Sequence, residues 1–454
     1  MLLTRHIYHI FRIIAIKKFN LLECDKKYPC KRLILLYKFH NNFILGNNKM
    51  KPASRVQAII EILTEVLKDK TPSDVILDNY FKQRRYIGSK DRRFISDSVW
   101  KIIRNRTKYT QMLENNATPR LLTAVNFIEE DLEVLFSKEE YAPSLLTKEE
   151  KQSINKAKSF DNFDEFAFYE CPKWLFDKFE NKELLASLNS TATLDVRANL
   201  TSREMAKERL KKEGLFFSFT PYSPIGLRCT DRINLNNCMT YQDGEIEVMD
   251  EASQIISLLC RVKAHHKTID YCAGAGGKSL AIAATLSNEG LIYAHDISIE
   301  RLSRIKKRAE RLDITNIKTI TNVVDKDYDR FIIDAPCSGS GTWRRCPDAK
   351  YRLSQEKLDE IIKTQCEILE FGANHTKTGG RLIYITCSVF KEENEKQIEN
   401  FLNQHTEFTP FNHKDLWQDT LDLSFYPFNS TDYISFSPLL TKTDGFFVCV
   451  MKKS

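Results

Sequence analysis

The sequence predicts an α/β protein: a doubly wound sheet that ends in an antiparallel hairpin, preceded by an all-α module. Two observations carry this prediction. From His266 onward, short apolar runs alternate with amphipathic helical patterns, as the strands and crossover helices of a parallel sheet do. Residues 50–136 hold only helical patterns, with apolar residues at three- and four-residue spacing. At 454 residues the chain is also too long for one compact core, so several domains are expected.

The composition and the breaks in pattern divide the chain into five segments. Met50-Lys51-Pro52 opens a clean amphipathic helix, so we expect the residues before it to be disordered or a mis-called start. The predicted segments are a basic extension at 1–49, a helical domain at 50–136, a polar linker at 137–168, a small α/β preparatory segment at 169–262 and a catalytic domain at 263–454.

The net charge gives no support for a nucleic-acid partner. The whole chain has a formal charge of +7, but residues 1–49 hold ten Lys or Arg against two acidic residues, which is +8. The remaining chain therefore carries 7 − 8 = −1. Any basic groove must be local.

The twelve cysteines form no Cys-x-x-Cys pair and no regular framework. Most lie in apolar runs, as reduced thiols do in cytosolic proteins, so we expect a cytoplasmic protein without a bound metal. We also expect a monomer. No window of about eighteen apolar residues exists, so no membrane span is predicted.

Helical patterns in the first domain lie at residues 54–67, 75–81, 94–103 and 121–136. The basic loop Arg84–Arg93 between them contains a tyrosine and is a candidate contact for a phosphate backbone, with a solvated loop as the alternative.

The preparatory segment shows a strand at 194–197, a helix at 202–213 and a strand at 226–228, which predicts a βαβ-like unit. In the catalytic domain the patterns alternate regularly. The predicted strands are 267–272, 291–296, 317–321, 330–334 and 381–386, the helices are 278–286, 299–312, 355–374 and 392–404, and the terminal hairpin joins 433–439 to 446–451.

A glycine-rich turn joins the first strand of the catalytic domain to its first helix, where backbone N–H groups can hold a polar ligand. Cys272 stands where a phosphate-binding P-loop needs glycine, and Ser279 occupies the third glycine position of a dinucleotide fingerprint. Asp296, at the end of the next strand, is placed to bind ribose hydroxyls. An adenosyl cofactor without phosphates fits both features. The predicted cofactor loop consists of Cys272, Ala273, Gly274, Ala275, Gly276, Gly277 and Lys278.

Two cysteines, Cys337 and Cys387, each follow an apolar strand. Because the carboxyl ends of parallel strands meet at one edge of a sheet, we expect both thiols to face one pocket. Cytosine C5 is a poor nucleophile, and a thiolate that attacks C6 makes C5 electron-rich enough to accept a methyl group from a sulfonium. A second group must then help remove the C5 proton and release the adduct. The two thiols therefore favour methylation of cytosine at C5.

These residues resemble the Sun-type RNA cytosine-C5 methyltransferases, and in particular the bacterial 16S ribosomal RNA enzymes with a NusB-type N-terminal domain. Nearly all of the chain after residue 49 takes part in the resemblance, with residues 52–135 similar to the NusB-type domain. The matching motifs are the cofactor loop Cys272–Lys278, the proline-cysteine motif Asp334–Gly341, the threonine-cysteine motif Ile385–Ser388 and the terminal motif Thr443–Phe447.

The resemblance implies S-adenosyl-L-methionine as cofactor and RNA, most of all 16S ribosomal RNA, as partner. It implies that Cys387 attacks C6, that Cys337 assists release, and that Asp334 binds the methionine end of the cofactor or the edge of the cytosine. In DNA cytosine methyltransferases the proline-cysteine residue is the nucleophile, so Cys337 remains the alternative.

The chain departs from this family in two places. Ala275 replaces a proline found in many members, which should loosen the cofactor loop. Where an acidic residue near the adenine is usual, the chain has Asn322, with Asp325 as a second candidate.

Two other functions compete with ribosomal RNA methylation. Transfer RNA methylation would use the same chemistry, and a catalytically idle RNA-binding assembly factor would need neither cysteine. The run Trp343-Arg344-Arg345 after the proline-cysteine motif is a candidate surface for stacking on single-stranded RNA.

Overall fold

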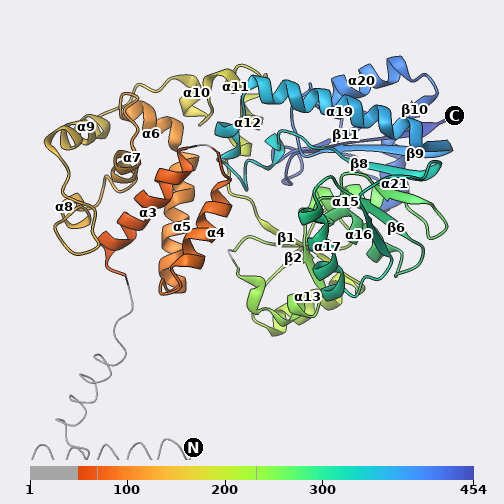
Figure 1. Cartoon of the computed structure of the whole chain (residues 1–454), viewed down its shortest axis with the longest axis horizontal. Coiled ribbons are helices and arrows are strands. Elements are labelled where there is room, and N and C mark those ends of the chain that lie inside the picture. The colour runs from red at the N-terminus through yellow and green to blue at the C-terminus, as the bar shows by residue number, and fades with distance from the viewer. Residues whose placement is uncertain (1–49, 69, 232) are drawn as a thin grey trace, which may run out of the picture.

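The structure is a computed structural model that describes residues 50–454, except 69 and 232. The prediction for residues 1–49 lies outside the described residues. Figure 1 shows a group of helices on one side of the molecule and a mixed α/β body on the other. Among the described residues, no helix is both long enough and apolar enough to cross a membrane.

The helical domain packs around α3 (Pro52–Val66), which has proline in its first turn, where the missing N–H costs no intrahelical bond. Its buried residues share one core with those of α5 (Ser89–Arg104) and of the shorter helices that follow. The structure confirms the helices predicted at 54–67, 75–81 and 94–103, but the stretch predicted at 121–136 is divided into two short helices by a turn at 127–131. The remaining helices are α4 (Ser73–Gln83), α6 (Arg106–Met112), α7 (Pro119–Asn126) and α8 (Leu132–Leu135).

The predicted linker, residues 137–168, is wrong in part, because it contains α9 (Lys148–Lys158). Thr147 and Glu150 form a capping box at its start, and Ile154 and Ala157 join the core of the helical domain. The sequence did not predict α9 because only two of its residues are buried and most of the others are charged or polar, so its apolar pattern is weak. The chain continues through α10 (Glu165–Phe168), α11 (Lys173–Phe176) and α12 (Lys182–Leu188).

The preparatory segment is a four-stranded sheet in the order β2-β3-β1-β4. The predicted strands and helix exist, but β1 and β3 pair antiparallel, so the βαβ-like unit is wrong. After α13 the chain first forms the short strand β2. It then turns back as β3, which pairs antiparallel with both β2 and β1. The elements are β1 (Leu194–Ala198), α13 (Arg203–Lys212), β2 (Ser218–Phe219), β3 (Gly226–Cys229), α14 (Met239–Gln242), β4 (Ile246–Val248) and α15 (Glu251–Leu259).

The catalytic domain is built on a sheet in the order β10-β12-β9-β8-β5-β6-β7, and β11 pairs with β12. The five strands from β9 to β7 run parallel, and β12 runs antiparallel to β9, as the sequence predicts. The strands are β5 (Thr268–Asp270), β6 (Ile292–His295), β7 (Ile317–Ile320), β8 (Tyr328–Asp334), β9 (Thr376–Thr386), β10 (Phe408–Pro410), β11 (Ile434–Phe436) and β12 (Phe446–Lys453).

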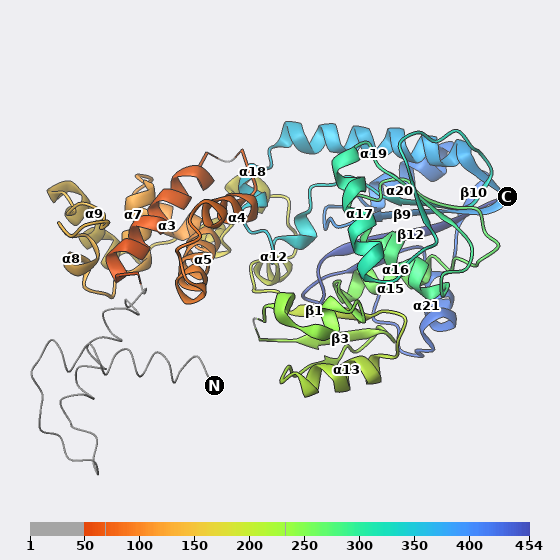
Figure 2. The ribbon, with the colours of Figure 1, turned by 60° about the horizontal axis from the view of Figure 1, so that its bottom comes forward.

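Successive side chains of the central strand β8 point to opposite faces of this sheet. Ile332 packs in a core with α15, α16 and α21, whereas Phe331 and Ile333 pack in a core with α19 and α20. Figure 2 shows α19 along one side of the sheet. These helices are α16 (Gly277–Thr285), α17 (Ile299–Arg311), α18 (Ala349–Arg352), α19 (Gln355–His375), α20 (Glu395–Gln404) and α21 (His413–Leu421).

The helical domain contacts the catalytic domain through the region of α18. The backbone N–H of Ser73 donates to Asp348 at 2.9 Å, and the hydroxyls of Thr107 and Tyr351 lie 3.0 Å apart. Tyr351 also packs against the core of the helical domain. The segment that follows the proline-cysteine motif is therefore a support for the helical domain.

Candidate active site

The two cysteines of the predicted site lie side by side. Asp334 and Ile385 are register partners on the parallel strands β8 and β9, so the loops that follow leave the sheet at the same edge. The sulfur atoms of Cys337 and Cys387 are 3.2 Å apart, and both residues are partly accessible. A single substrate atom can therefore be reached by either thiol.

Backbone hydrogen bonds hold the cysteine loops and the terminal motif together. Gly341 donates its N–H to the carbonyl of Cys387 at 2.9 Å, and Gly445 donates to the carbonyl of Gly341 at 2.8 Å. A Cβ on Gly341 would lie 2.0 Å from the Gly445 carbonyl oxygen. The approach of the three segments thus requires glycine at this position.

A buried ion pair joins the cofactor loop to the proline-cysteine motif. Lys278 Nζ lies 2.7 Å from Asp334 Oδ2, and the lysine side chain is only 6% exposed. Burial disfavours its ammonium form, but Asp334, Cys387 and Asp270 together outweigh that effect and raise the pKa of Lys278. Lys278 therefore places a positive charge at Asp334, where it also interacts electrostatically with Cys387.

The protons of the two thiols are not equivalent. The hydrogen bond with Cys387, followed by burial, raises the pKa of Cys337 well above its ordinary value. Glu393 adds to the shift. The two sulfur atoms share one hydrogen bond, in which either thiol can be the donor.

The cofactor loop follows β5 and has two residues in the left-handed region. Gly274 has φ +56° and Gly276 has φ +80°, and a Cβ at Gly276 would also lie 2.8 Å from Ile305. Asp296 accepts the N–H of Gly274 at 2.9 Å through Oδ2 and that of Ser298 at 2.8 Å through Oδ1. This aspartate fixes the loop, and each of its oxygens keeps a second lone pair for a ribose hydroxyl.

The loop fits an adenosyl cofactor that carries an amino-acid group. No atom lies within 4 Å of a Cβ built on Gly274 or Gly277, so the loop faces open space. Asp270 Oδ1 is buried and has no hydrogen-bond partner among the described residues, while Ser279 donates to Oδ2 at 2.5 Å. An ammonium group of a ligand would satisfy that oxygen.

Ala275, where the sequence comparison expected a looser loop for want of proline, is held by a hydrogen bond from another element. Arg308 of α17 donates a hydrogen bond from Nη1 to the carbonyl of Ala275 at 2.5 Å. The same guanidinium also contacts Glu247 of β4 at 3.2 Å. An arginine thus tethers the loop at the position of Ala275.

The two candidates for the adenine contact lie at different edges of the sheet. Asn322 follows the carboxyl end of β7, next to the end of β6 that carries Asp296. Asp325 lies 3.6 Å from Lys267, which precedes the amino end of β5. The geometry therefore speaks against Asp325 and leaves Asn322 as the candidate.

The run from Trp343 to Arg345 does not form an RNA-stacking surface, so this prediction is wrong. Trp343 is 1% exposed and packs against Phe179 and Phe390. Arg344 and Arg345 both bind Asp444 of the terminal motif. The partner lies about one hundred residues along the chain, which no local pattern could reveal.

Sequence reasoning missed two residues of this region. Ile297, directly after Asp296, is 94% exposed, which is unusual for isoleucine and gives an apolar face beside the cofactor loop. Glu393 is fully buried beneath both cysteine loops. The only sequence signal for it was the acidic pair Glu392-Glu393 ahead of a helix.

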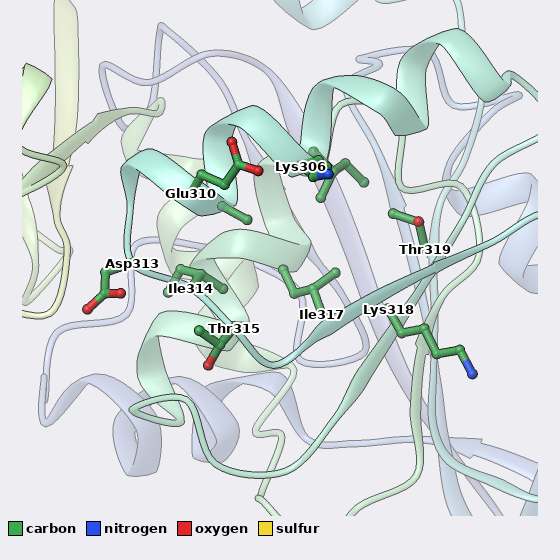
Figure 3. A pocket seen from close by; sticks show the side chains of 10 residues that line it. Lys306, Glu310, Asp313, Ile314, Thr315, Ile317, Lys318 and Thr319 are labelled. Carbon is green, nitrogen blue, oxygen red and sulfur yellow. The ribbon is translucent and has the colours of Figure 1, made fainter.

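A surface hollow of about 510 Å³ lies away from the cysteines, between α17 and β7 (Figure 3). None of the predicted site residues lines it. Within the described part of the chain, no three His, Cys, Asp or Glu side chains are grouped so that they could hold a metal ion.

The strand order, the glycine loop after β5 and the aspartate after β6 are those of the S-adenosylmethionine-dependent methyltransferase fold. Residues 257–452 match the model of the family described as 16S rRNA methyltransferase RsmB/F.

The chain is similar to two proteins described as probable ribosomal RNA small subunit methyltransferase B. Identity is 33% over 222 residues with the Bacillus subtilis protein, which covers 47% of this chain and 49% of the relative. It is 29% over 306 residues with the Synechocystis protein, with coverage of 63% and 67%. The matched regions thus span about half to two thirds of these relatives.

Two solved structures share the fold. The crystal structure of PH0851 superposes with a TM-score of 0.71 at 25% identity and covers 89% of this chain and 99% of that one. NSun6 from Pyrococcus horikoshii, solved with SFG, an S-adenosylmethionine analogue, gives a TM-score of 0.56 at 19% identity and covers 62% and 98%.

Proposed function

We propose that the protein transfers a methyl group from S-adenosylmethionine to C5 of a cytosine in 16S ribosomal RNA. The observation that carries this proposal is the pair of thiols, 3.2 Å apart, at the sheet edge that also holds the cofactor loop. The names of the family and of the relatives support ribosomal RNA as the substrate.

In the first step, the Cys387 thiolate forms a bond to C6 of the cytosine. The addition places negative charge on the ring, toward N3 and O2, and Lys278 supplies a positive charge near Cys387 to stabilise it. Asp334, which pairs with Lys278, is available to accept a hydrogen bond from the exocyclic amino group of the cytosine. When bound, S-adenosylmethionine supplies the electrophilic methyl group for C5.

In the last step, the C5 proton must leave and the bond between Cys387 and C6 must break. Once that sulfur is bonded to carbon, it no longer accepts the hydrogen bond that is the largest cause of the raised pKa of Cys337. Cys337 then releases its own proton to water and, as a thiolate, accepts the C5 proton while the sulfur of Cys387 leaves C6 with the bonding electron pair. The asymmetry of the pair thus gives each thiol its role at its own step.

The arrangement of the cofactor loop supports the cofactor contacts proposed from the sequence. The backbone of residues 272–277 and the side chain of Lys278 line the loop, and Asp296 and Asn322 follow the neighbouring strands. We add Ile297, whose exposed aliphatic side chain offers one face for the adenine ring. No structural observation favours transfer RNA, and the intact thiol pair argues against a catalytically idle factor.

The experiment that tests this proposal compares Cys337→Ala with Cys387→Ala. Each variant is incubated with cofactor and unmodified 16S ribosomal RNA, and protein–RNA adducts are sought on a denaturing gel. We expect a stable adduct with Cys337→Ala, because release fails, and none with Cys387→Ala.

The opposite pattern would assign the nucleophile to Cys337. If the unaltered protein methylated transfer RNA but not ribosomal RNA, the proposed substrate would be wrong. If it methylated neither RNA, the proposed enzymatic activity would be wrong. Cys366→Ala is the matched control, because Cys366 is an exposed thiol on α19.

A further inference from the structure

Glu393 is a fully buried carboxylate that binds both cysteine loops. On the first loop, its Oε1 accepts the N–H of Ser338 at 2.8 Å, and its Oε2 accepts the Ser338 hydroxyl. On the second loop, Oε2 accepts the hydroxyl of Ser388. Each of these serines directly follows one of the two cysteines.

The carboxylate is completely satisfied by donors. Gln365 of α19 supplies a further N–H to Oε1 at 3.1 Å, so the two oxygens of Glu393 receive four hydrogen bonds. An ionised carboxylate has about four lone-pair positions and no proton to donate. The site is therefore built for the charged form of glutamate.

The hydroxyl network around Glu393 has one direction. Ser388 donates to Glu393, so its oxygen is free to accept the N–H of Phe390 at 3.0 Å and the hydroxyl of Ser340 at 2.9 Å. Ser340 in turn accepts the N–H of Val389 at 2.9 Å. The residues that follow each of the two thiols thus depend on one acceptor.

We propose that Glu393 is the positioning residue that sets the separation of the two thiols for the proposed methyl transfer. The carboxylate pulls Ser338 and Ser388 toward one point, and the preceding cysteines are thereby held at the contact distance of their sulfur atoms. The role of Glu393 in methyl transfer rests on the proposed function, whereas its effect on the distance between the two sulfur atoms does not.

The variant that isolates the carboxylate is Glu393→Gln. Glutamine keeps the volume and one carbonyl acceptor, but its amide group faces donors where the second oxygen stood. The matched control is Glu392→Gln, because Glu392 lies next to it and pairs with Lys178 outside the cysteine loops at 3.3 Å.

The first measurement needs neither RNA nor cofactor. Diamide oxidises the two thiols to a disulfide and takes up the two hydrogens itself, and the Cys337–Cys387 linkage is quantified by peptide mass spectrometry. We expect the linkage to form at least fivefold more slowly in Glu393→Gln than in the unaltered protein, and at the unaltered rate in Glu392→Gln.

The second measurement separates positioning from binding. In Glu393→Gln we expect the turnover number for methyl transfer to fall at least tenfold, while the KM values for RNA and cofactor stay within twofold. A fall in turnover together with a large rise in KM would indicate a general loss of structure and would count against the proposal.

The double variant Ser338→Ala, Ser388→Ala keeps the glutamate and should slow disulfide formation to a similar extent. The double variant provides the test if Glu393→Gln does not fold. Unaltered rates of disulfide formation in either variant would overturn the proposal. If the unaltered protein methylates no RNA, the proposed function fails, but the disulfide rates still decide whether Glu393 sets the distance.

Discussion

At the residue scale, the site depends on which of two neighbouring thiols holds a proton. The sequence predicted both cysteines because each follows a strand of a parallel sheet, where ligands gather. It could not predict that the hydrogen bond between them would raise the pKa of Cys337. That effect depends on a contact between two sulfur atoms whose residues are fifty positions apart in the chain.

Another residue-scale effect concerns the terminal strand. His413 is fully buried, and its Nε2 accepts the N–H of Val450 in β12 at 2.9 Å, so the ring must be neutral. Burial lowers the pKa of His413 from 6.5 to about 4. As the pH falls below 6.5, the unfolded chain takes up a proton that the folded protein does not.

This difference predicts that His413 makes the protein less stable in mild acid. Its contribution is present above pH 6.5 and is lost as the pH falls toward about 4, with about 2 kcal/mol lost by pH 5. The check is urea unfolding of the unaltered protein and of His413→Gln at pH 7 and pH 5. The stability gap between them should narrow at pH 5, and a constant gap would contradict the assignment.

At the scale of elements, regular alternation was a reliable guide and isolated patterns were not. The strands and helices from β5 to β9 follow the apolar runs, because both faces of that sheet are covered by helices. Helix α9 was hidden by its charged residues. The pairing of β1 with β3 depended on the short strand β2, whose two residues are exposed.

The tether from α17 to the cofactor loop gives a prediction at this scale. Arg308→Met removes the donor to the carbonyl of Ala275, and we expect cofactor affinity to fall about tenfold, or about 1.4 kcal/mol. Adding Ala275→Pro should restore most of the affinity, because Ala275 has no positive φ and its N–H makes no hydrogen bond within the described residues.

Isothermal titration calorimetry with S-adenosylhomocysteine measures both steps. Arg304→Met is the matched control, because Arg304 lies one turn earlier on α17 and pairs only with the exposed Glu300 among the described residues. A double variant no tighter than Arg308→Met would show that the arginine acts by another route.

At the scale of the whole molecule, one arginine joins three segments. Arg104 of α5 donates to the carbonyl of Arg344 at 2.5 Å, and to those of Asn189 and Ser190 at 3.2 and 3.1 Å. The helical domain, the preparatory segment and the segment after the proline-cysteine motif therefore meet at one guanidinium. No sequence pattern could reveal this junction, because its acceptors are backbone carbonyls.

Arg104→Met should weaken the docking of the helical domain. Loss of hydrogen bonds from a charged donor is expected to cost about 2–4 kcal/mol at the interface. Differential scanning calorimetry should then resolve two unfolding transitions where the unaltered protein has one. Lys101→Met, an exposed change on the same helix, should leave a single transition. One unshifted transition in Arg104→Met would show that the junction adds no stability.

The contact between Gly341 and Gly445 also has a meaning for how such chains vary. The two backbones approach so closely that a methyl group on either glycine would meet the other residue. A change at one position cannot be relieved by a smaller residue at the other, since both are already the smallest. Natural variants that keep both cysteines but lose either glycine should therefore be inactive. This pair of positions thus offers a way to distinguish active homologues from inactive ones.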